Sequence, residues 1–298
     1  MTAMNQWIFG DITIDRVVEF QDSVFPPAAM YPQATESAIN AHRSWLEPRL
    51  LDPANGLLIF SFHTFVIRTR GRTILVDTCG GNDKPRAGKP RYHQKRWPYL
   101  ERLAAVGVKR EDVDVVVCTH LHVDHVGWNT HLVEGCWLPT FPRARYVFVR
   151  KEWEFWQEEY KTERFTGDPY YEDSIVPIFE ARLADLVESD LRLADGVWLE
   201  PSPGHTPGHV CVHVSGGGRD AVMSGDLMHH PLQCAEPDWS SCFCVDPAHS
   251  ARTRHSFLER YADTSTLVMP AHFPAPSAGR ILRDGTAFRF VFDEAGYG

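Results

Sequence analysis

The densest group of side chains that could do chemistry lies directly after one apolar run. Residues 113–118 are rich in β-branched side chains and predict a buried strand. His120, His122, Asp124 and His125 follow within seven residues of its end. Imidazole and carboxylate groups bind zinc and similar divalent ions, and alternate residues at a strand end can point into one coordination sphere. A lone histidine is more often a hydrogen-bonded polar residue than a ligand, but this spacing predicts a metal centre.

Three later pieces of the sequence repeat the arrangement of a strand followed by a metal-type residue. His205 lies in the loop 203–209, where glycines and prolines stiffen the chain after a short strand. Asp226 follows the predicted strand 221–223, and His272 follows the predicted strand 267–269. Each piece places a metal-type side chain at the exit of a strand.

The pattern of apolar residues predicts the elements that carry these side chains. Strand-like runs and helical periodicity follow one another along the chain, and a turn at Gly71 joins the first two strands into a hairpin. The predicted strands are 57–69, 73–76, 113–118, 145–149, 197–199, 210–214, 221–223 and 267–269, and the predicted helices are 99–106, 152–160, 177–187 and 250–261. Two blocks of strands followed by helices predict two stacked sheets with helices outside, which is an α/β fold with a four-layer αββα sandwich.

The N-terminal part of the chain lacks this regularity. Residues 1–45 alternate short apolar pieces with prolines, and we expect an irregular N-terminal arm there that lies on the domain. The arm is a weak indication of a homodimer contact. We interpret residues 1–298 as a single domain, because the length suits one large domain and no internal repeat divides the chain.

Composition narrows the classes of function. The formal net charge of −9 would repel a phosphate backbone, and no basic stripe counters it, so nucleic acid is not an expected partner. No run of about 18 apolar residues predicts a membrane span, and the first ten residues do not have the pattern of an export signal. Seven scattered cysteines favour a reducing compartment over a disulfide framework. We therefore expect a cytoplasmic protein that acts on a small molecule.

The four metal-type pieces, in this order, resemble the metallo-β-lactamase superfamily over roughly residues 57–275. The resemblance implies the αββα fold with a site between the sheets at one edge. It also implies that His120, His122 and His205 bind one metal ion, that Asp124, His125 and His272 bind another, and that Asp226 bridges both. Two divalent cations are the expected cofactors, with zinc favoured and manganese, iron or cobalt also suited to such ligands.

The bridging position narrows the resemblance further. Members that hydrolyse β-lactams generally lack a carboxylate at the position of Asp226, whereas hydrolases of lactones, thioesters and phosphoesters have one. The segments 225–230 and 270–274 look like the methyl parathion hydrolase and lactonase-type branch. Acyl-homoserine lactonases usually have a tyrosine three residues after the bridging aspartate, and His229 stands there instead. That difference leaves acyl-homoserine lactones open as substrates.

The resemblance implies a dinuclear metal-dependent hydrolase that uses a bridging hydroxide on a small hydrophobic lactone or carboxylic ester, with organophosphate triesters as further substrates. Asp124 would orient the hydroxide and relay a proton, and His229 is the candidate to contact the substrate oxygen or the leaving group. The alternatives are a thioesterase and a non-catalytic metal-binding or ligand-binding member of the superfamily. All seven ligand positions are filled, which favours an enzyme.

Aromatic residues near the motifs are the expected walls of the substrate pocket. The candidates are Trp128, Trp239, Phe243 and Phe273. Trp153 and Trp156 share one face of a predicted helix, for which core packing is the favoured interpretation. Metal-bound imidazoles need a partner for their second nitrogen, and Asp77, Thr119 and His209 are candidates. For His209 we favour an ordinary turn role.

Overall fold

Two seven-stranded sheets form the centre of the computed structural model, which describes residues 6–162 and 169–294. In the order of their pairing, the first sheet contains β1 (Gln6–Phe9), β2 (Ile12–Phe25), β3 (Leu58–Thr69), β4 (Arg72–Val76), β5 (Val115–Val117), β8 (Arg145–Val149) and β9 (Ala184–Val187). The second contains β10 (Arg192–Ala194), β11 (Val197–Pro201), β12 (Val210–Gly216), β13 (Arg219–Gly225), β14 (Leu267–Pro270), β15 (Gly279–Asp284) and β16 (Ala287–Phe292). A separate hairpin pairs β6 (Thr130–Val133) with β7 (Cys136–Pro139).

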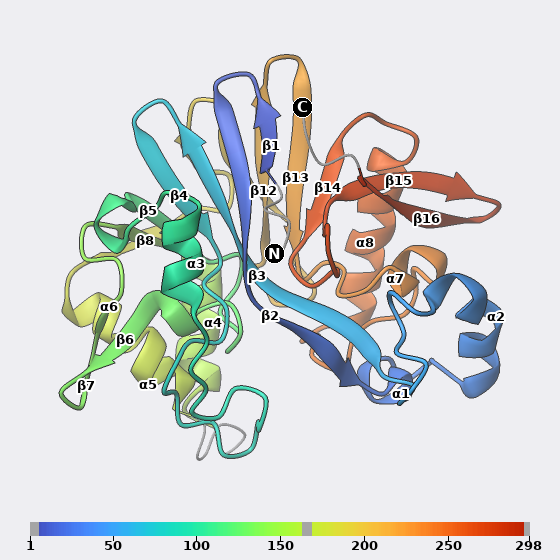
Figure 1. Cartoon of the computed structure of the whole chain (residues 1–298), viewed down its shortest axis with the longest axis horizontal. Helices are drawn as coiled ribbons and strands as arrows, with labels where there is room; N and C mark the ends of the chain where they lie inside the picture. Colours follow the sequence, from blue (N-terminus) through green and yellow to red (C-terminus); the bar gives the residue numbers. More distant parts are fainter. Residues whose placement is uncertain (1–5, 163–168, 295–298) are drawn as a thin grey trace.

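Helices cover the outer faces of both sheets (Figure 1). They are α1 (Pro27–Met30), α2 (Glu36–Leu46), α3 (Tyr99–Ala105), α4 (Arg150–Glu159), α5 (Tyr170–Ser174), α6 (Val176–Glu180), α7 (Leu232–Ala235) and α8 (Pro247–Tyr261), with short 3-10 turns at Arg110–Asp112 and Gly127–Asn129. Helices α3 to α6 lie beside the first sheet, and α8 lies beside the second.

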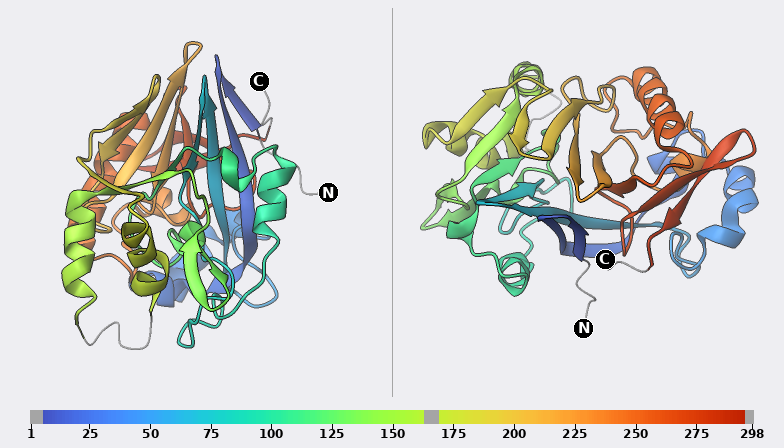
Figure 2. Two further views of the ribbon diagram at one scale, coloured as in Figure 1. Left: turned by 90° about the vertical axis from the view of Figure 1, so that its left-hand side faces the viewer. Right: turned by 90° about the horizontal axis from the view of Figure 1, so that it is seen from above.

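The two-residue period of the strands explains the layers. In β5, Val115 and Val117 face the core between the sheets, whereas Val116 faces the core under α3 to α6. In β13, Met223 contributes to the core between the sheets and Val222 to the core under α8. Each sheet therefore contributes side chains to a core on both of its faces. Figure 2 shows the two sheets and their helices from two further directions. The predicted four-layer αββα sandwich is confirmed.

The N-terminal segment differs from the predicted irregular arm. Residues 6–9 and 12–25 form β1 and β2, and β2 pairs with β3 in antiparallel register from Thr13↔Arg68 to Phe25↔Leu58. The prediction of irregularity for residues 1–45 was wrong in the described part, because pairing along a long neighbouring strand outweighs the broken local pattern. Residues 1–5 of the predicted arm lie outside the described residues.

The predicted helix 177–187 was also wrong over its second half. Helix α6 ends at Glu180, Arg182 has a positive φ of 58°, and the chain continues as strand β9. Strand β9 pairs in parallel with β8, from Tyr146↔Ala184 to Val149↔Val187. Tertiary pairing therefore overrides the helical spacing of the apolar residues. The other predicted helices and strands are present, with ends shifted by a few residues.

Candidate metal centre

Four strands deliver the predicted ligands to one edge of the sandwich. Strands β13 and β14 are parallel, with Met223 opposite Met269 and Gly225 opposite Pro270. Strand β11 runs in the same direction as β13, because both are antiparallel to β12. The backbone amide of Val210 at the start of β12 donates to the carbonyl of Thr119 after β5 (3.0 Å), which ties the two sheets together at this edge.

Asp77 and Thr119 hold the loop that carries the first four ligands. Asp77 directly follows β4, and its carboxylate accepts hydrogen bonds from the Thr119 amide (2.7 Å) and the Thr119 hydroxyl (2.9 Å). The same carboxylate lies 2.8 Å from Nδ1 of His125. Two of the three residues predicted to support the ligands therefore do contact the loop.

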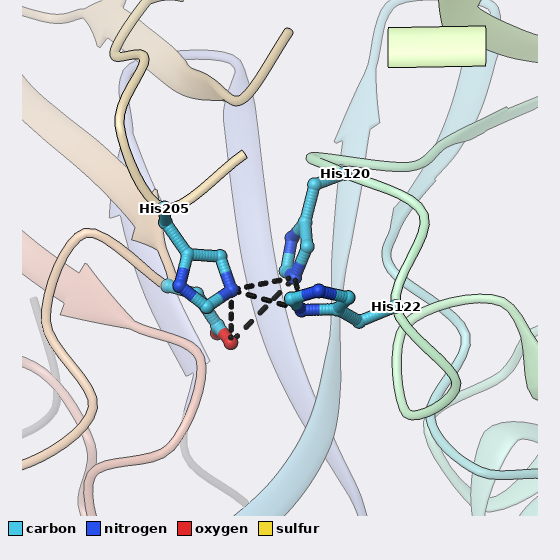
Figure 3. A group of neighbouring side chains, drawn as sticks. His120, His122 and His205 are labelled. Carbon is cyan, nitrogen blue, oxygen red and sulfur yellow. Dashed lines mark hydrogen bonds and ion pairs between the residues drawn. The ribbon is translucent and has the colours of Figure 1, made fainter. Parts of the chain in front are cut away.

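The first donor group joins the two sheets. Nε2 of His120 lies 3.0 Å from Nδ1 of His122, and Nε2 of His205 lies 3.2 Å and 2.9 Å from these two atoms. Figure 3 shows the three imidazoles pointing toward one another, with a carboxylate oxygen beside them. That oxygen is Oδ2 of Asp226, which lies 3.3 Å from Nε2 of His205 and 3.6 Å from Nε2 of His120.

The second donor group adjoins the first through the same carboxylate. Oδ1 of Asp226 lies 3.0 Å from Nε2 of His272 and 3.2 Å from Nε2 of His125. The Asp124 carboxylate lies slightly further out, 3.9 Å from His125 and 3.8 Å from His272. Potential ligand atoms of Asp124, His125 and His272 all lie within 4.8 Å of one another, as do those of the first group. The structure thus brings all seven predicted ligands together.

The hydrogen bonds of the outer ring nitrogens show that the inner nitrogens are acceptors. The Thr119 hydroxyl donates to Asp77, so it accepts from Nδ1–H of His120 (3.1 Å). Nδ1–H of His272 donates to the carbonyl of Ser61 (3.2 Å). In their neutral forms, His120 and His272 therefore point Nε2 lone pairs at the Asp226 carboxylate, whose Oδ1 has no hydrogen bond among the described residues. Hydrogen-bond acceptors that face one another in a buried site need a positively charged partner between them. Divalent cations fit this arrangement.

The pKa shifts divide the five ligand imidazoles, since the pKa is lowered at His120, His122 and His205 and raised at His125 and His272. Burial, together with the neighbouring histidines, lowers the pKa of His120 and of His205 well below the ordinary value. Burial lowers the pKa of His122 to about 3. Burial also opposes a charge on His125, but the carboxylates of Asp226 and Asp77 outweigh it and hold the pKa of His125 well above the ordinary value. A neutral imidazole is the form that binds a metal ion.

His229 and His230 lie in different surroundings. Nε2 of His229 is 3.1 Å from Oδ2 of Asp226, and its ring is 4.8 Å from the ring of His205. His230 instead lies with Nε2 3.0 Å from the carbonyl of Leu50. His229 therefore faces the donor groups, and His230 supports the backbone of a neighbouring segment.

His209 supports the aspartate that lies between the two groups. Its Nδ1 lies 2.8 Å from the Ser202 hydroxyl, and its Nε2 accepts a hydrogen bond from the backbone amide of Asp226 (3.0 Å). Gly225 has a φ of +49°, and a Cβ there would lie 2.6 Å from Nε2 of His209. The favoured interpretation of His209 as an ordinary turn residue was wrong, because it fixes the backbone that presents Asp226.

A cavity of about 640 Å³ opens above the donor groups. His122, Asp124, Asp226, His229 and His272 form its floor. Most of its walls are apolar or aromatic, and they include Phe25, Met30, Phe60, Phe62, Tyr92, Val123, Trp156, Tyr170 and Phe243, with Lys89 and Arg91 also in the lining. The Tyr92 hydroxyl donates to the Asp124 carboxylate (3.0 Å). No sequence motif marks Tyr92, and the sequence analysis missed it.

Three of the four predicted wall residues lie away from this cavity. Trp128 stacks on Tyr99, Trp239 packs against Tyr31, and Phe273 packs edge-on against Phe290. These three side chains belong to the buried cores, so the prediction that they line the pocket was wrong. Trp128 and Phe273 lie close to ligands in sequence, but the chain turns their rings inward.

Phe243 and Trp156 do line the cavity. Phe243 is 40 % exposed and lies 5.6 Å from the ring of Phe25. Trp156, which was expected to serve core packing, is buried and also contacts His122, with ring centroids 5.1 Å apart. A role of these rings in substrate binding stays a prediction.

An αββα sandwich with clustered histidines and aspartates at one edge defines a class of metal-binding fold. The chain belongs to the metallo-beta-lactamase superfamily, whose sequence model matches residues 63–272. The match includes the strands and loops that carry all seven predicted ligands.

Lactonases are among the relatives in sequence. An N-acyl homoserine lactonase AttM of Azorhizobium caulinodans is 29% identical over 229 residues, which cover 70% of this chain and 80% of that protein. An N-acyl homoserine lactonase of Bacillus cereus is 32% identical over 107 residues, or 36% of this chain. The chain spans only about a third (35%) of the length of that Bacillus relative in the alignment.

Solved structures share the fold at low sequence identity. The hydrolase AbOPH in the beta lactamase superfamily has a TM-score of 0.81 at 20% identity, with 98% of this chain and 97% of that chain covered. AidC, a dizinc quorum-quenching lactonase, has a TM-score of 0.76 at 19% identity, with the same shares covered.

Among the described residues, no helix is both long enough and apolar enough to cross a membrane.

Proposed function

We propose that the protein is a dinuclear metal-dependent hydrolase of a small hydrophobic lactone or carboxylic ester. The observation that carries the proposal is the Asp226 carboxylate, which lies between two groups of imidazole donors at the floor of an apolar cavity. One cation would be held by His120, His122 and His205, the other by Asp124, His125 and His272. Zinc suits this set of ligands.

The residues around the donor groups can contribute to different steps of hydrolysis. Bound divalent cations would supply Lewis acidity toward the substrate oxygen and a water molecule acidic enough to react near neutral pH. The Asp124 carboxylate lines the cavity and is oriented by the Tyr92 hydroxyl, so it can accept a proton from the attacking water. His229 is buried and lies beside Asp226, where its ring can donate a hydrogen bond to a substrate oxygen or a leaving alkoxide.

The shape and polarity of the cavity support an apolar substrate. Aromatic side chains make up much of its wall, and such walls exclude water and bind acyl or aryl groups without demanding charge. The similarity to N-acyl homoserine lactonases supports a lactone as the substrate class. Esters and thioesters share the trigonal carbonyl carbon of a lactone, whereas phosphotriesters react at a tetrahedral phosphorus, and turnover measured side by side on all four substrates can rank them.

The test compares the wild type with Asp226→Ala, and uses Asp220→Ala as a control on the same strand, where the side chain is exposed. Metal bound per chain is measured first, and turnover is then measured on a lactone, an aryl ester, a thioester and a phosphotriester. We expect two ions and lactone or ester turnover in the wild type and in Asp220→Ala, and loss of both in Asp226→Ala.

Three results would contradict the proposal. A wild type that cannot be loaded with metal would exclude the dinuclear centre. A wild type that holds two ions but turns over only the thioester would make the protein a thioesterase, and no turnover at all would favour the non-catalytic alternative.

A further inference from the structure

A buried carboxylate outside the donor groups contacts both of the loops that carry the first group. Glu152 lies at the start of α4 and is 1% exposed. Its Oε1 accepts a hydrogen bond from the backbone amide of Leu121 (3.1 Å), and its Oε2 accepts one from the backbone amide of Gly208 (2.9 Å). Leu121 stands between His120 and His122, and Gly208 stands three residues after His205.

The same carboxylate also fixes the ring behind one of the ligands. Oε1 of Glu152 accepts a short hydrogen bond from the indole nitrogen of Trp156 (2.6 Å). The Trp156 ring contacts the imidazole of His122 edge to face, with centroids 5.1 Å apart. One side chain on α4 thus contacts the backbone between His120 and His122, the loop that carries His205, and the ring on its own helix that packs against His122.

Close packing leaves this arrangement little freedom. A Cβ at Gly208 would lie 2.4 Å from the backbone nitrogen of Glu152, so the loop after His205 approaches the helix backbone directly. The second donor group is held by other residues, since His125 contacts Asp77 and His272 contacts the carbonyl of Ser61. The backbone contacts of Glu152 are therefore next to the ligands of the first donor group, at Leu121 and Gly208.

We infer that Glu152 is a positioning residue that preorganises His120, His122 and His205 for one of the two metal ions. The inference rests on the proposed dinuclear centre. A buried carboxylate that accepts from both loops holds them in the ligand-bearing conformation before a cation arrives. Without it, binding must also order the loops, and the cost appears as weaker affinity for that ion alone.

The test measures the affinity of each ion in Glu152→Gln and Glu152→Ala by competition with a chromogenic chelator. Loss of a partner group that orients metal ligands typically costs about 10-fold to 100-fold in metal affinity. We expect such a loss for one ion, larger in Glu152→Ala than in Glu152→Gln, and wild-type affinity for the other. Anomalous diffraction from zinc should show that the ion at His120, His122 and His205 is the one lost.

Two further variants keep the test decisive. Glu154→Gln removes the same charge from an exposed position on the same helix and should retain both ions. Trp156→Phe keeps a ring beside His122 but removes the N–H that binds Glu152. It should lower the affinity for the same ion to a smaller extent, and it replaces Glu152→Ala in the test if that variant does not fold.

The outcomes separate this inference from the proposed function. If the wild type binds no metal, the proposed function fails first. If the wild type binds two ions and the folded Glu152 variants bind both with unchanged affinity, the inference is wrong. A purely structural role would lower the melting temperature of the metal-free protein and leave both metal affinities unchanged, and that result would also overturn it.

Discussion

Replacement of Asp173 by asparagine should destabilise the protein strongly, although Asp173 lies outside the metal centre. Asp173 accepts two hydrogen bonds from the Arg86 guanidinium (2.6 and 2.8 Å) and lies 3.3 Å from Nζ of Lys84. Lys84 is 0% exposed and Arg86 is 1% exposed. Asp173 therefore pairs with two buried basic side chains, and these contacts tie the loop before Tyr92 to helix α5.

The expected loss follows from the cost of removing one partner of a buried ion pair. Removing one partner of a buried ion pair costs about 3–5 kcal/mol, because the remaining charge stays out of water without compensation. Unfolding entropy near 60 °C is about 2.1 cal/mol/K per residue, and the chain has 298 residues. One kcal/mol then corresponds to about 1.6 °C, so Asp173→Asn should lower the melting temperature by about 5–8 °C.

Thermal unfolding followed by circular dichroism measures this shift, and Asp185→Asn is the matched control. Asp185 pairs with Arg145 at the surface, where the two side chains are 42% and 43% exposed. Surface pairs contribute about 0–1 kcal/mol, so the control should shift by less than about 2 °C. Equal shifts in the two variants would refute the reasoning, because burial would then not determine the cost.

The remaining predictions concern pH, catalysis and metal. Burial lowers the pKa of Lys84 from 10.5 to about 7. Between these two pH values the Lys84 side chain binds a proton in the unfolded chain but not in the folded one, so the free energy of unfolding should rise with pH. Urea titrations should show this rise in the wild type relative to Lys84→Met, by up to about 1.4 kcal/mol per pH unit. His229→Ala should lower kcat by about 10²-fold to 10⁴-fold while the metal content stays at the wild-type level; unchanged kcat would exclude a catalytic role. Tyr92→Phe removes the donor to Asp124 and should lower kcat by about 10-fold to 100-fold, since a hydrogen bond to a charged group contributes about 1.5–3 kcal/mol; an effect on KM alone would limit Tyr92 to substrate binding. A chelator should abolish turnover and lower the melting temperature, and added zinc should restore both; activity that survives metal removal would contradict the proposed chemistry.

The predicted ligands could be found from the sequence because their signal is local. His120, His122, Asp124 and His125 stand together after one apolar run, and a strand that ends in such residues has few structural explanations. His205, Asp226 and His272 each follow a strand as well. The side chains that support them leave no such signal. Glu152 is one of several acidic residues on an amphipathic helix, and its partners Leu121 and Gly208 lie 31 and 56 residues away.

The same contrast explains the errors in the fold. Residues 12–25 form a long strand although Asp15, Arg16 and Glu19 interrupt its apolar residues. All three side chains are buried, and Glu19 accepts hydrogen bonds from the amides of Gly80 and Gly81 and from the indole of Trp128. In the fold, the Glu19 carboxylate satisfies donors that no backbone partner reaches.

Glu19 and Glu152 show how the centre is supported from both sides of its first loop. Glu19 holds the turn after Asp77 and the indole that follows His125, and Glu152 holds the amide between His120 and His122. Each carboxylate accepts hydrogen bonds from segments far apart in the chain, so neither can act until the sheets and helices have packed. The ligands identify the class of site, and these buried acceptors determine whether the ligands meet at the distances that a metal ion requires.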